Sequence, residues 1–498
     1  MSLKKNYKWD PAFILGDEEM GRWAEKNLES CLFHDAMSLR RLDIDFSNLK
    51  EIFPVDSDIL SKLARFESNY FNWLQETAES NFTFRQRRKY FYNILTFWNS
   101  IINQVKPSLF VAYTWPHTPG DYPLYLLCKY VYNIPVLFLE YTPYFDQKNY
   151  AISTSLENLS ASFTRIYSSK NELPLSKIVS DHLEELRSND AKRPDHIEQY
   201  ERILDEELKN FSFWRSLFKG ILSGNLFKKA QVSFKKNKSF ETSSFSMSNM
   251  EYLLFQRKMI SMNRNLSDQY KVLTKKLNLD EDYIYFAAPY QPEANSNIAV
   301  GVYEDVELMI QMISKAKPKG WKILYKEHPT TFFPTSKGCL ERDNIFYKNL
   351  SEIEDVVFVP VSTSTFDLID NSRAVCTAGG TVGWEALVRG KPSIIFGALW
   401  YQKCKSVFSI STLQDLKKAF LNIKEGFLPS EEDIDRFAES VYRSTYSGLI
   451  RINDIDEYHE EDEQILIEVT SKAIYNEFCR HYDSNSPFDD PYMIRRSN

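Results

Sequence analysis

The sequence predicts an α/β protein with more than one domain, and three observations carry that prediction. The 498 residues are 43% hydrophobic and 26% charged, which is a globular composition, and roughly 100–200 residues per domain gives two to four domains. Strand-like and helix-like segments alternate between residues 283 and 396. A strand–helix–strand pattern over residues 108–140 predicts parallel strands in the first half too. We therefore expect two α/β parts, the second a doubly wound parallel sheet.

In the first half, helices are predicted to surround the βαβ unit. Residues 10–105 are predicted to be mainly helical, with long stretches at 57–79 and 84–105 that lack strand-like alternation. Short apolar runs at 108–113 and 134–140 are the predicted strands of the unit.

The middle of the chain is predicted to contain no strand between residues 153 and 278. Residues 209–238 carry eight Lys or Arg and no Asp or Glu, with aromatic residues at helical spacing. Two interpretations stay open. The segment is either a linker helix with solvated lysines, or a basic amphipathic helix that lies on an anionic membrane surface.

The second half is predicted element by element. The expected strands are 283–287, 321–326, 356–360, 373–378 and 392–396, and the expected helices are 304–316, 365–371 and 382–389. Ligands bind at the carboxyl ends of the strands in such sheets, so residues that directly follow these strands are the first candidates for a site. Helices between 413 and 481 are expected to complete or brace this part.

Charge and apolar patterning disfavour several classes of protein. The 61 Lys and Arg against 68 Asp and Glu leave a net charge of −7, which does not support a protein-wide attraction to nucleic acid and leaves only a local basic patch open. No apolar run reaches the ~18 residues of a membrane span, and the N-terminus lacks the apolar stretch of a signal peptide, so a cytosolic protein is expected. The six cysteines show no CxxC spacing, which argues against a zinc ribbon or disulfide scaffold.

Glycine usage points to one backbone-lined site. The chain has 15 glycines, and five of them lie between residues 379 and 397, whereas an average protein is roughly 7% glycine throughout. Two of these glycines lie between a predicted strand and a helix, and a third lies in the first turn of that helix. Turn amides and a threonine hydroxyl there can bind a phosphate, and a glutamate can meet ribose hydroxyls. The alternative is tight strand–helix packing alone. The predicted nucleotide-binding residues here are Gly379, Gly380, Thr381, Gly383 and Glu385.

A second motif, Lys326-Glu-His-Pro329, directly follows a predicted strand. Pro329 favours extended geometry at His328, so the imidazole can project over the strand end. Together with Lys326 it would stabilise negative charge on a leaving phosphate. The alternative is a histidine with a structural role.

A third motif, Gln291-Pro-Glu293, follows the first strand of the second half. Pro289 and Pro292 would hold the Glu293 carboxylate in a fixed direction, which suits a general base or a nucleophile. Gln291 is a candidate substrate contact. An ordinary loop with a surface glutamate is the alternative.

Weaker candidates follow other strands. Ser362 and Thr363 offer hydroxyls to a nucleotide, although helix capping is the simpler interpretation of this segment. In the first half, His117, Asp121 and Glu140 are candidate contacts for an acceptor substrate. Short acidic pairs in the chain do not establish a metal site.

Together these motifs resemble those of a known family. In order and spacing, Gln291–Glu293, Lys326–Pro329 and Gly379–Leu387, followed by Gly390–Pro392 and Phe396–Gly397, resemble bacterial capsule and surface-polysaccharide biosynthesis proteins. That group includes the β-Kdo glycosyltransferases of capsule and lipopolysaccharide assembly. The resemblance covers residues 283–401 well and the βαβ region weakly. It implies a GT-B architecture, in which two Rossmann-like domains face each other across a cleft, here with extra helices in the N-terminal half and linker.

The resemblance also implies roles and substrates. His328 and Lys326 would contact the donor phosphate, with the glycine-rich turn around it, and Glu293 would be the nucleophile or base. The implied donor is CMP-Kdo or a related CMP-activated acidic sugar, and the acceptor is a growing glycan or glycolipid. No metal cofactor is expected, because imidazole, lysine and backbone amides can stabilise the departing CMP.

The expected division of the chain has four segments. They are an acceptor-side domain with helical additions (1–205), a basic helical linker (206–278), a nucleotide-donor domain (279–425) and bracing helices (426–498). The basic helix at 209–238 would hold the enzyme near the inner leaflet of the cytoplasmic membrane. Competing interpretations are a UDP-sugar 2-epimerase, a CDP-polyol phosphotransferase and a non-catalytic capsule-assembly protein.

Overall fold

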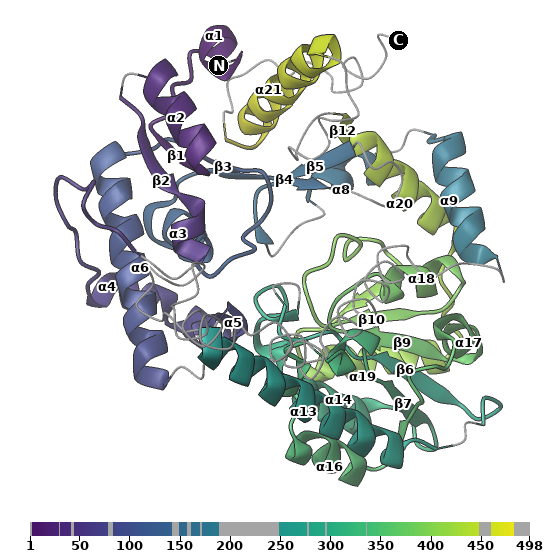
Figure 1. Cartoon of the computed structure of the whole chain (residues 1–498). Helices are drawn as coiled ribbons and strands as arrows, with labels where there is room; N and C mark the ends of the chain where they lie inside the picture. The colour runs from purple at the N-terminus through teal and green to yellow at the C-terminus, as the bar shows by residue number, and fades with distance from the viewer. Residues whose placement is uncertain are drawn as a thin grey trace, which may run out of the picture.

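A computed structural model gives the fold. It describes residues 2–28, 30–40, 44–77, 83–141, 149–156, 161–169, 172–188, 249–275, 278–293, 296–334, 336–447 and 460–482. Figure 1 shows two α/β parts, one built from the purple and blue N-terminal elements and the other from the teal and green elements. The last helices of the chain lie beside the N-terminal part (Figure 1).

The N-terminal part contains two small sheets among the described residues. β1 (Phe13–Gly16) and β2 (Leu32–Asp35) form a parallel pair. The other sheet has the order β12-β5-β4-β3, made of β3 (Phe110–Ala112), β4 (Val136–Tyr141), β5 (Asn149–Ser153) and β12 (Tyr446–Ser447). β3 and β4 are parallel, which confirms the predicted βαβ unit, whereas β5 is antiparallel to both neighbours.

Helices surround these sheets. They are α1 (Ser2–Tyr7), α2 (Glu18–Asn27), α3 (Ala36–Arg40), α4 (Ser57–Leu63), α5 (Glu67–Thr77), α6 (Phe84–Val105), α7 (Tyr122–Leu126), α8 (Ala161–Tyr167) and α9 (Lys177–Arg187). A short π-helix, Leu127–Tyr132, continues α7. α6 has the predicted bounds because Thr83 and Gln86 form a reciprocal capping box at its start.

The second part is built on one six-stranded parallel sheet, in the order β11-β10-β9-β6-β7-β8. Its strands are β6 (Tyr283–Ala287), β7 (Lys322–Lys326), β8 (Val356–Phe358), β9 (Ala374–Thr377), β10 (Ser393–Ile395) and β11 (Val407–Ser409). Its helices are α13 (Asn249–Leu273), α14 (Val306–Ala316), α15 (Gly338–Glu341), α16 (Asn344–Glu352), α17 (Thr365–Asn371), α18 (Val382–Val388) and α19 (Leu413–Lys424). Two short 3-10 helices, η6 (Gly301–Glu304) and η7 (Pro329–Phe332), lie in its loops.

The central strand β6 is buried on both faces. Ile284 and Phe286 pack into one core cluster, while Tyr283 and Tyr285 pack into another on the opposite face. A parallel strand covered on both sides is apolar without alternation, which is why this segment could be predicted with its exact bounds. The doubly wound parallel sheet is confirmed.

The strand order reverses at β6. The chain runs from β6 to β7 and β8 on one side, then returns to β9, β10 and β11 on the other. Ala287, the last residue of β6, is in register with Lys326 of β7 and Thr377 of β9. The loops after these three strands therefore leave the sheet side by side, at the switch point where such sheets bind ligands.

Contacts join the two parts at several places. The Asn69 side chain in α5 donates to the Gly301 carbonyl oxygen at 2.6 Å, and Asn72 Nδ2 donates to Glu304 Oε1 at 2.7 Å. At the other end of the chain, α20 (Glu431–Ser444) contacts α8 and α9, and α21 (Glu460–Tyr482) contacts α1. These helices therefore carry the end of the chain back to the N-terminal part.

The structure corrects parts of the sequence prediction. β1 and β2 lie within residues 10–105, which were expected to be helical; each has only four residues, too few for alternation to show. Two strands that were not predicted, β5 and β12, extend the predicted parallel pair through antiparallel pairings. Residues 209–238 lie outside the described residues, so neither interpretation of the basic segment is tested, and the domain boundaries stay predictions.

Candidate functional site

The His-Pro loop begins where β7 ends. His328 precedes η7, and its Nδ1 accepts a hydrogen bond from the backbone N–H of Thr330 at 3.2 Å. A neutral imidazole whose Nδ1 accepts must carry its proton on Nε2. The loop thus prepares the other ring nitrogen of His328 as a donor, which is the form that binds a phosphate oxygen.

The last residue of β7, Lys326, is buried with only 5% of its surface exposed. Its Nζ donates to the carbonyl oxygen of Thr363 at 2.6 Å and to Oγ1 of Thr365 at 2.9 Å. The ammonium therefore ties β7 to the loop after β8. Its positive charge still lies at the strand ends, where it makes the electrostatic potential more positive and so favours the binding of an anion.

The loop after β6 carries Glu293, which is exposed. The backbone N–H of Glu293 donates to Oδ1 of Asn297 at 2.9 Å, and its carbonyl oxygen accepts from the backbone N–H of Asn297 at 2.9 Å. The loop is thus held from its backbone, with the carboxylate on the surface. Tyr290 of the same loop lies against His328, with ring centroids 5.9 Å apart.

Gln291 has a different setting from the one expected for a substrate contact. It is 2% exposed, its amide donates to the carbonyl oxygens of Ser296 and Glu304, and its Oε1 accepts from Arg342. These contacts all lie within the protein. Gln291 shapes the loop that presents Glu293.

The glycine-rich turn follows β9. Gly380 is exposed and has a φ of +83°, a conformation that favours glycine. A Cβ at Gly383 would overlap the Tyr401 hydroxyl and lie 2.6 Å from Ser393 Oγ, so this glycine permits close packing of α18. Gly379 and Gly380 thus form the turn, while Gly383 serves the packing that was the alternative interpretation.

Thr381 and Glu385 are paired within this turn. The Thr381 hydroxyl donates to Glu385 Oε1 at 2.6 Å, and burial raises the pKa of Glu385. Of the two hydroxyl candidates after β8, Ser362 is exposed and Thr363 is half-buried, with its carbonyl oxygen bound to Lys326. The structure thus brings loops from β6, β7, β8 and β9 to one edge of the sheet.

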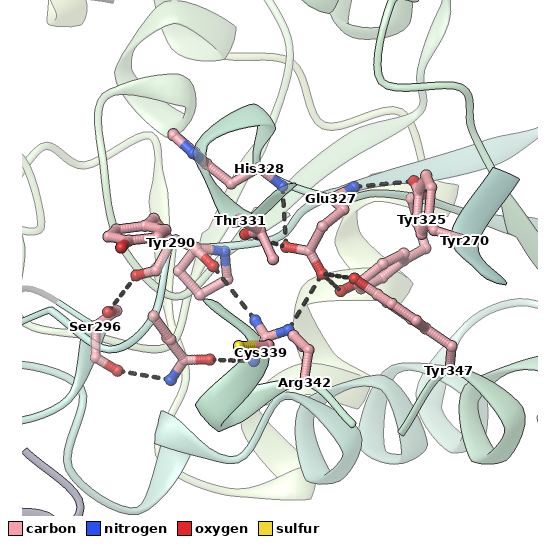
Figure 2. A network of polar contacts seen from close by, with 12 residues as sticks. Tyr270, Tyr290, Ser296, Tyr325, Glu327, His328, Thr331, Cys339, Arg342 and Tyr347 are labelled. Atoms are coloured by element: carbon pink, nitrogen blue, oxygen red, sulfur yellow. Dashed lines mark hydrogen bonds and ion pairs between the residues drawn. The ribbon is translucent and has the colours of Figure 1, made fainter. Parts of the chain in front are cut away.

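A buried network that sequence reasoning missed lies beneath two of these loops (Figure 2). Glu327 is fully buried and Arg342 is 3% exposed, and Arg342 Nε lies 3.1 Å from Glu327 Oε2. The same carboxylate accepts from the hydroxyls of Tyr325, Tyr347 and Thr331 and from the backbone N–H of His328. Glu327 sits between Lys326 and His328 in sequence, so its position inside the motif was the available signal.

The three N-terminal candidates lie in and after β3 and β4. His117 is exposed, and its Nδ1 donates to the carbonyl oxygen of Trp115 at 2.7 Å. Asp121 accepts from the backbone N–H of Thr118, and burial raises its pKa to about 6. Glu140 accepts from the Ser153 hydroxyl at 2.8 Å, and burial raises its pKa to about 7.

Within the described residues, no cluster of His, Cys, Asp or Glu is arranged to hold a metal ion. Over the same part of the chain, no helix combines the length and apolar character required to cross a membrane.

A comparison with protein families matches the part of the chain that carries the motifs. Residues 189–404, less than half of the chain, match the family described as "Capsule polysaccharide biosynthesis protein". The chain resembles capsule polysaccharide biosynthesis proteins. The match contains the Glu293, His328 and Gly380 loops, so it confirms the expected resemblance. No curated protein is similar in sequence.

Solved structures give weaker likenesses. The β-Kdo 2,7 transferase of Thermosulfurimonas dismutans KpsC is 18% identical, with a TM-score of 0.21 over 39% of this chain and 67% of that chain. The β-Kdo 2,4 transferase of the same KpsC is 11% identical, with a TM-score of 0.29 over 66% and 86%. UDP-GlcNAc 2-epimerase from Methanocaldococcus jannaschii is 13% identical, with a TM-score of 0.26 over 87% and 99%. At these values, none of the three assigns an activity to this chain.

The capsule-synthesis resemblance and the fold agree. Each part of the chain contains parallel strands with helices around them, which is a GT-B-like combination of two α/β units. The motifs that carry the resemblance are the loops at the carboxyl edge of the second sheet.

Proposed function

We propose that this protein is a glycosyltransferase of capsule or lipopolysaccharide biosynthesis, which transfers a sugar from a CMP-activated donor to a growing glycan or glycolipid. The proposed donor is CMP-Kdo or a related acidic sugar. The observation that carries the proposal is the register of Ala287 with both Lys326 and Thr377. That register sets the loops of Glu293, His328 and Gly380 next to one another at the switch point of a parallel sheet. The capsule family match over these residues supports the same reading.

On the donor side, the CMP phosphate would lie between the His-Pro loop and the glycine-rich turn. The Nε2 proton of His328 would bind a phosphate oxygen, and the Lys326 charge would stabilise the phosphate as the sugar leaves. The bond between the anomeric carbon and the phosphate oxygen breaks, and its electron pair departs with CMP. A monophosphate leaving group stabilised in this way needs no metal ion, so the proposed reaction is metal-independent.

Around the nucleoside, the proposed contacts come from the turn after β9 and the loop after β8. Gly379, Gly380 and Thr381 would approach through the backbone, with Glu385 near the ribose and Ser362 and Thr363 opposite. Gly383 would contribute indirectly, because it lets α18 pack close to the sheet.

Glu293 would act at the reacting sugar. As a base, its carboxylate would take the proton of the acceptor hydroxyl while the acceptor oxygen forms the new bond. As a nucleophile, it would first form a bond to the anomeric carbon as CMP leaves. The acceptor oxygen would then displace Glu293, and the freed carboxylate would take the acceptor proton. The anomeric configuration of the product, read by NMR, distinguishes the two roles, because one displacement inverts the centre and two retain it.

The acceptor would be bound by the N-terminal part, where His117, Asp121 and Glu140 are the proposed contacts. The enzyme would work in the cytoplasm, peripherally on the inner face of the membrane through residues 209–238. We propose this attachment from the eight basic residues and aromatic spacing of that segment.

Calorimetric binding of CMP, CDP, UDP and GDP tests the donor side. We expect selective CMP binding by the wild type, weakened at least tenfold by His328→Ala and unchanged by His117→Ala, which alters a histidine of the other part. Glu293→Gln should abolish transfer from CMP-Kdo while keeping CMP binding, and Glu281→Gln, at an exposed glutamate just before β6, should change neither. Preference for UDP would favour an epimerase instead, and a Glu293→Gln variant with wild-type turnover would remove that residue from the mechanism.

A further inference from the structure

The buried ion pair beneath the His-Pro loop lies between two loops of the proposed site. Glu327 Oε1 accepts from the backbone N–H of His328 at 2.9 Å, and its Oε2 lies 3.1 Å from Arg342 Nε. Arg342 in turn donates to Gln291 Oε1 at 2.8 Å and to the Pro289 carbonyl oxygen at 3.3 Å. One continuous chain of hydrogen bonds thus connects the backbone of His328 with the loop that carries Glu293.

We propose that Glu327 and Arg342 are positioning residues that fix the donor-binding His328 relative to the Glu293 loop. The inference rests on the proposed function and deepens it, because neither residue would touch the donor. Figure 2 shows the His328 ring pointing away from the network that holds its backbone. The network therefore acts on the site only through the loops.

The chemistry of the pair explains why it is suited to this task. The Arg342 guanidinium has three directed contacts, to a carboxylate, an amide oxygen and a backbone carbonyl, a fork that a lysine ammonium does not reproduce. Its Cζ also lies over the Phe346 ring, 4.6 Å from the centroid. The neighbouring carboxylate and tyrosines raise the pKa of Arg342 despite burial, so the fork stays charged.

The Glu327 carboxylate is equally constrained. It accepts from the hydroxyls of Tyr325 at 2.6 Å and Tyr347 at 2.9 Å in addition to its ion pair. Tyr270 of α13 accepts from the Glu327 backbone N–H at 3.0 Å and donates to the carbonyl oxygen of Val359, directly after β8. A buried charge with this many partners has one low-energy orientation, so the backbone that it holds has one as well.

Arg342→Lys tests the inference, and Arg443→Lys is its matched control. Arg443 also pairs through Nε with a buried carboxylate, Glu439, and also donates to a proline carbonyl, Pro174, but in α20. We would measure CMP affinity by calorimetry, the melting temperature, and the His328 Cε1–H resonance in histidine-labelled protein, assigned with His328→Ala among the seven histidines.

Arg342→Lys should shift the His328 resonance and weaken CMP binding at least tenfold. Arg443→Lys should lower the melting temperature about as much as Arg342→Lys does. It should neither shift the His328 resonance nor weaken CMP binding. An unmoved His328 resonance in a folded Arg342→Lys variant would overturn the inference. A wild type that binds no CMP would instead overturn the proposed function, while the resonance would still decide the positioning role.

Gln291→Met supplies a second, milder variant, and it decides the matter if Arg342→Lys does not fold. It removes one of the two hydrogen bonds between Arg342 and the Glu293 loop and leaves the one to the Pro289 carbonyl oxygen. It also removes the two backbone contacts of the Gln291 amide. We expect a tenfold lower kcat for transfer from CMP-Kdo with an unchanged donor KM, because Glu293 is displaced and His328 is not. Equal losses in kcat and CMP affinity, or no loss at all, would contradict a network that positions the two loops separately.

Discussion

Lys326 Nζ lies 2.6 Å from the carbonyl oxygen of Thr363, so the last residue of β7 anchors the loop that follows β8. A second bond, to Thr365 Oγ1, reaches the first residue of α17. Lys326, which was expected to contact a phosphate, thus holds the loop after β8 in place. The two roles are separable by experiment.

Lys326→Met should weaken CMP binding by more than Thr365→Val does. Both variants remove the hydrogen bond between Lys326 and Thr365, and Lys326→Met also removes the bond to the Thr363 carbonyl oxygen and the positive charge. Thr365→Val leaves the ammonium in place. We expect at least a tenfold loss of CMP affinity for Lys326→Met and less than a threefold loss for Thr365→Val by calorimetry. Equal losses would mean that Lys326 only supports the loop.

Gly380→Ala should reduce CMP binding and destabilise the protein by roughly 1–2 kcal/mol, because alanine is strained at a φ of +83°. Gly426→Ala is the control, since Gly426 has a φ of +100° after α19 and an added Cβ there also meets nothing within 4 Å. The two variants should unfold at similar urea concentrations, but only Gly380→Ala should lose CMP affinity. Intact binding in Gly380→Ala would exclude this turn from the donor site.

Gly383→Ala should be more harmful than Gly380→Ala to stability. The new Cβ would collide with the Tyr401 hydroxyl, which donates to the Gly380 carbonyl oxygen at 3.0 Å. Overpacking of this kind typically costs about 1–3 kcal/mol. Urea unfolding measures the loss, and a Gly383→Ala protein as stable as the wild type would show that α18 can move without consequence.

Glu140→Gln should stabilise the protein at neutral and alkaline pH. Burial raises the pKa of Glu140 from 4.5 to about 7, so between these values the folded state keeps a proton that the unfolded chain has lost. Stability therefore falls as pH rises through this window, by up to about 3 kcal/mol for such a shift. A glutamine has no such pH dependence and keeps the acceptor for Ser153. The urea midpoints of the wild type and Glu140→Gln should coincide at pH 4, and that of Glu140→Gln should be higher at pH 8. The same difference at both pH values would contradict a raised pKa of Glu140 in the folded state.

Asn69→Leu should weaken the junction between the two parts. It removes the hydrogen bond to Gly301 at 2.6 Å and leaves a carbonyl without that donor, a loss of roughly 1–3 kcal/mol. We expect the urea transition, monitored by tryptophan fluorescence, to become broader or to split into two steps. Asn349→Leu, which removes bonds to Glu307 within the second part, should lower stability and keep the shape of the transition. Identical transitions in the two variants would show that Asn69 does not couple the parts.

Much of the second part could be predicted from sequence because its strands are buried on both faces. The bounds of β6 and α17 match the prediction, and the other predicted strands and helices of this sheet are present with shifts of one or two residues at their ends. β11 lies at the sheet edge and none of its three residues is buried. It was missed because such a strand lacks the apolar run of the strands that are covered on both faces.

The candidate site was predictable only as a set of loops. Placing Glu293, His328 and Gly380 after strands was enough to put them on one edge of a parallel sheet. The burial of Gln291 and Lys326 was not predictable, since both are polar residues whose partners come from distant segments. The partners of Gln291 include Arg342, 51 residues further along the chain.

The sequence by itself determined the parallel sheet, its central strand and the loops that carry the chemistry, because local apolar periodicity and glycine or proline turns encode these features. Only the tertiary structure decided which polar side chains face the site and which hold it together. Glu327 and His328 are adjacent in sequence. The Glu327 side chain is buried among tyrosines and an arginine, whereas the His328 side chain projects from the loop. Which of the two side chains is buried depends on contacts with residues far away in the sequence, and no local sequence pattern encodes these contacts.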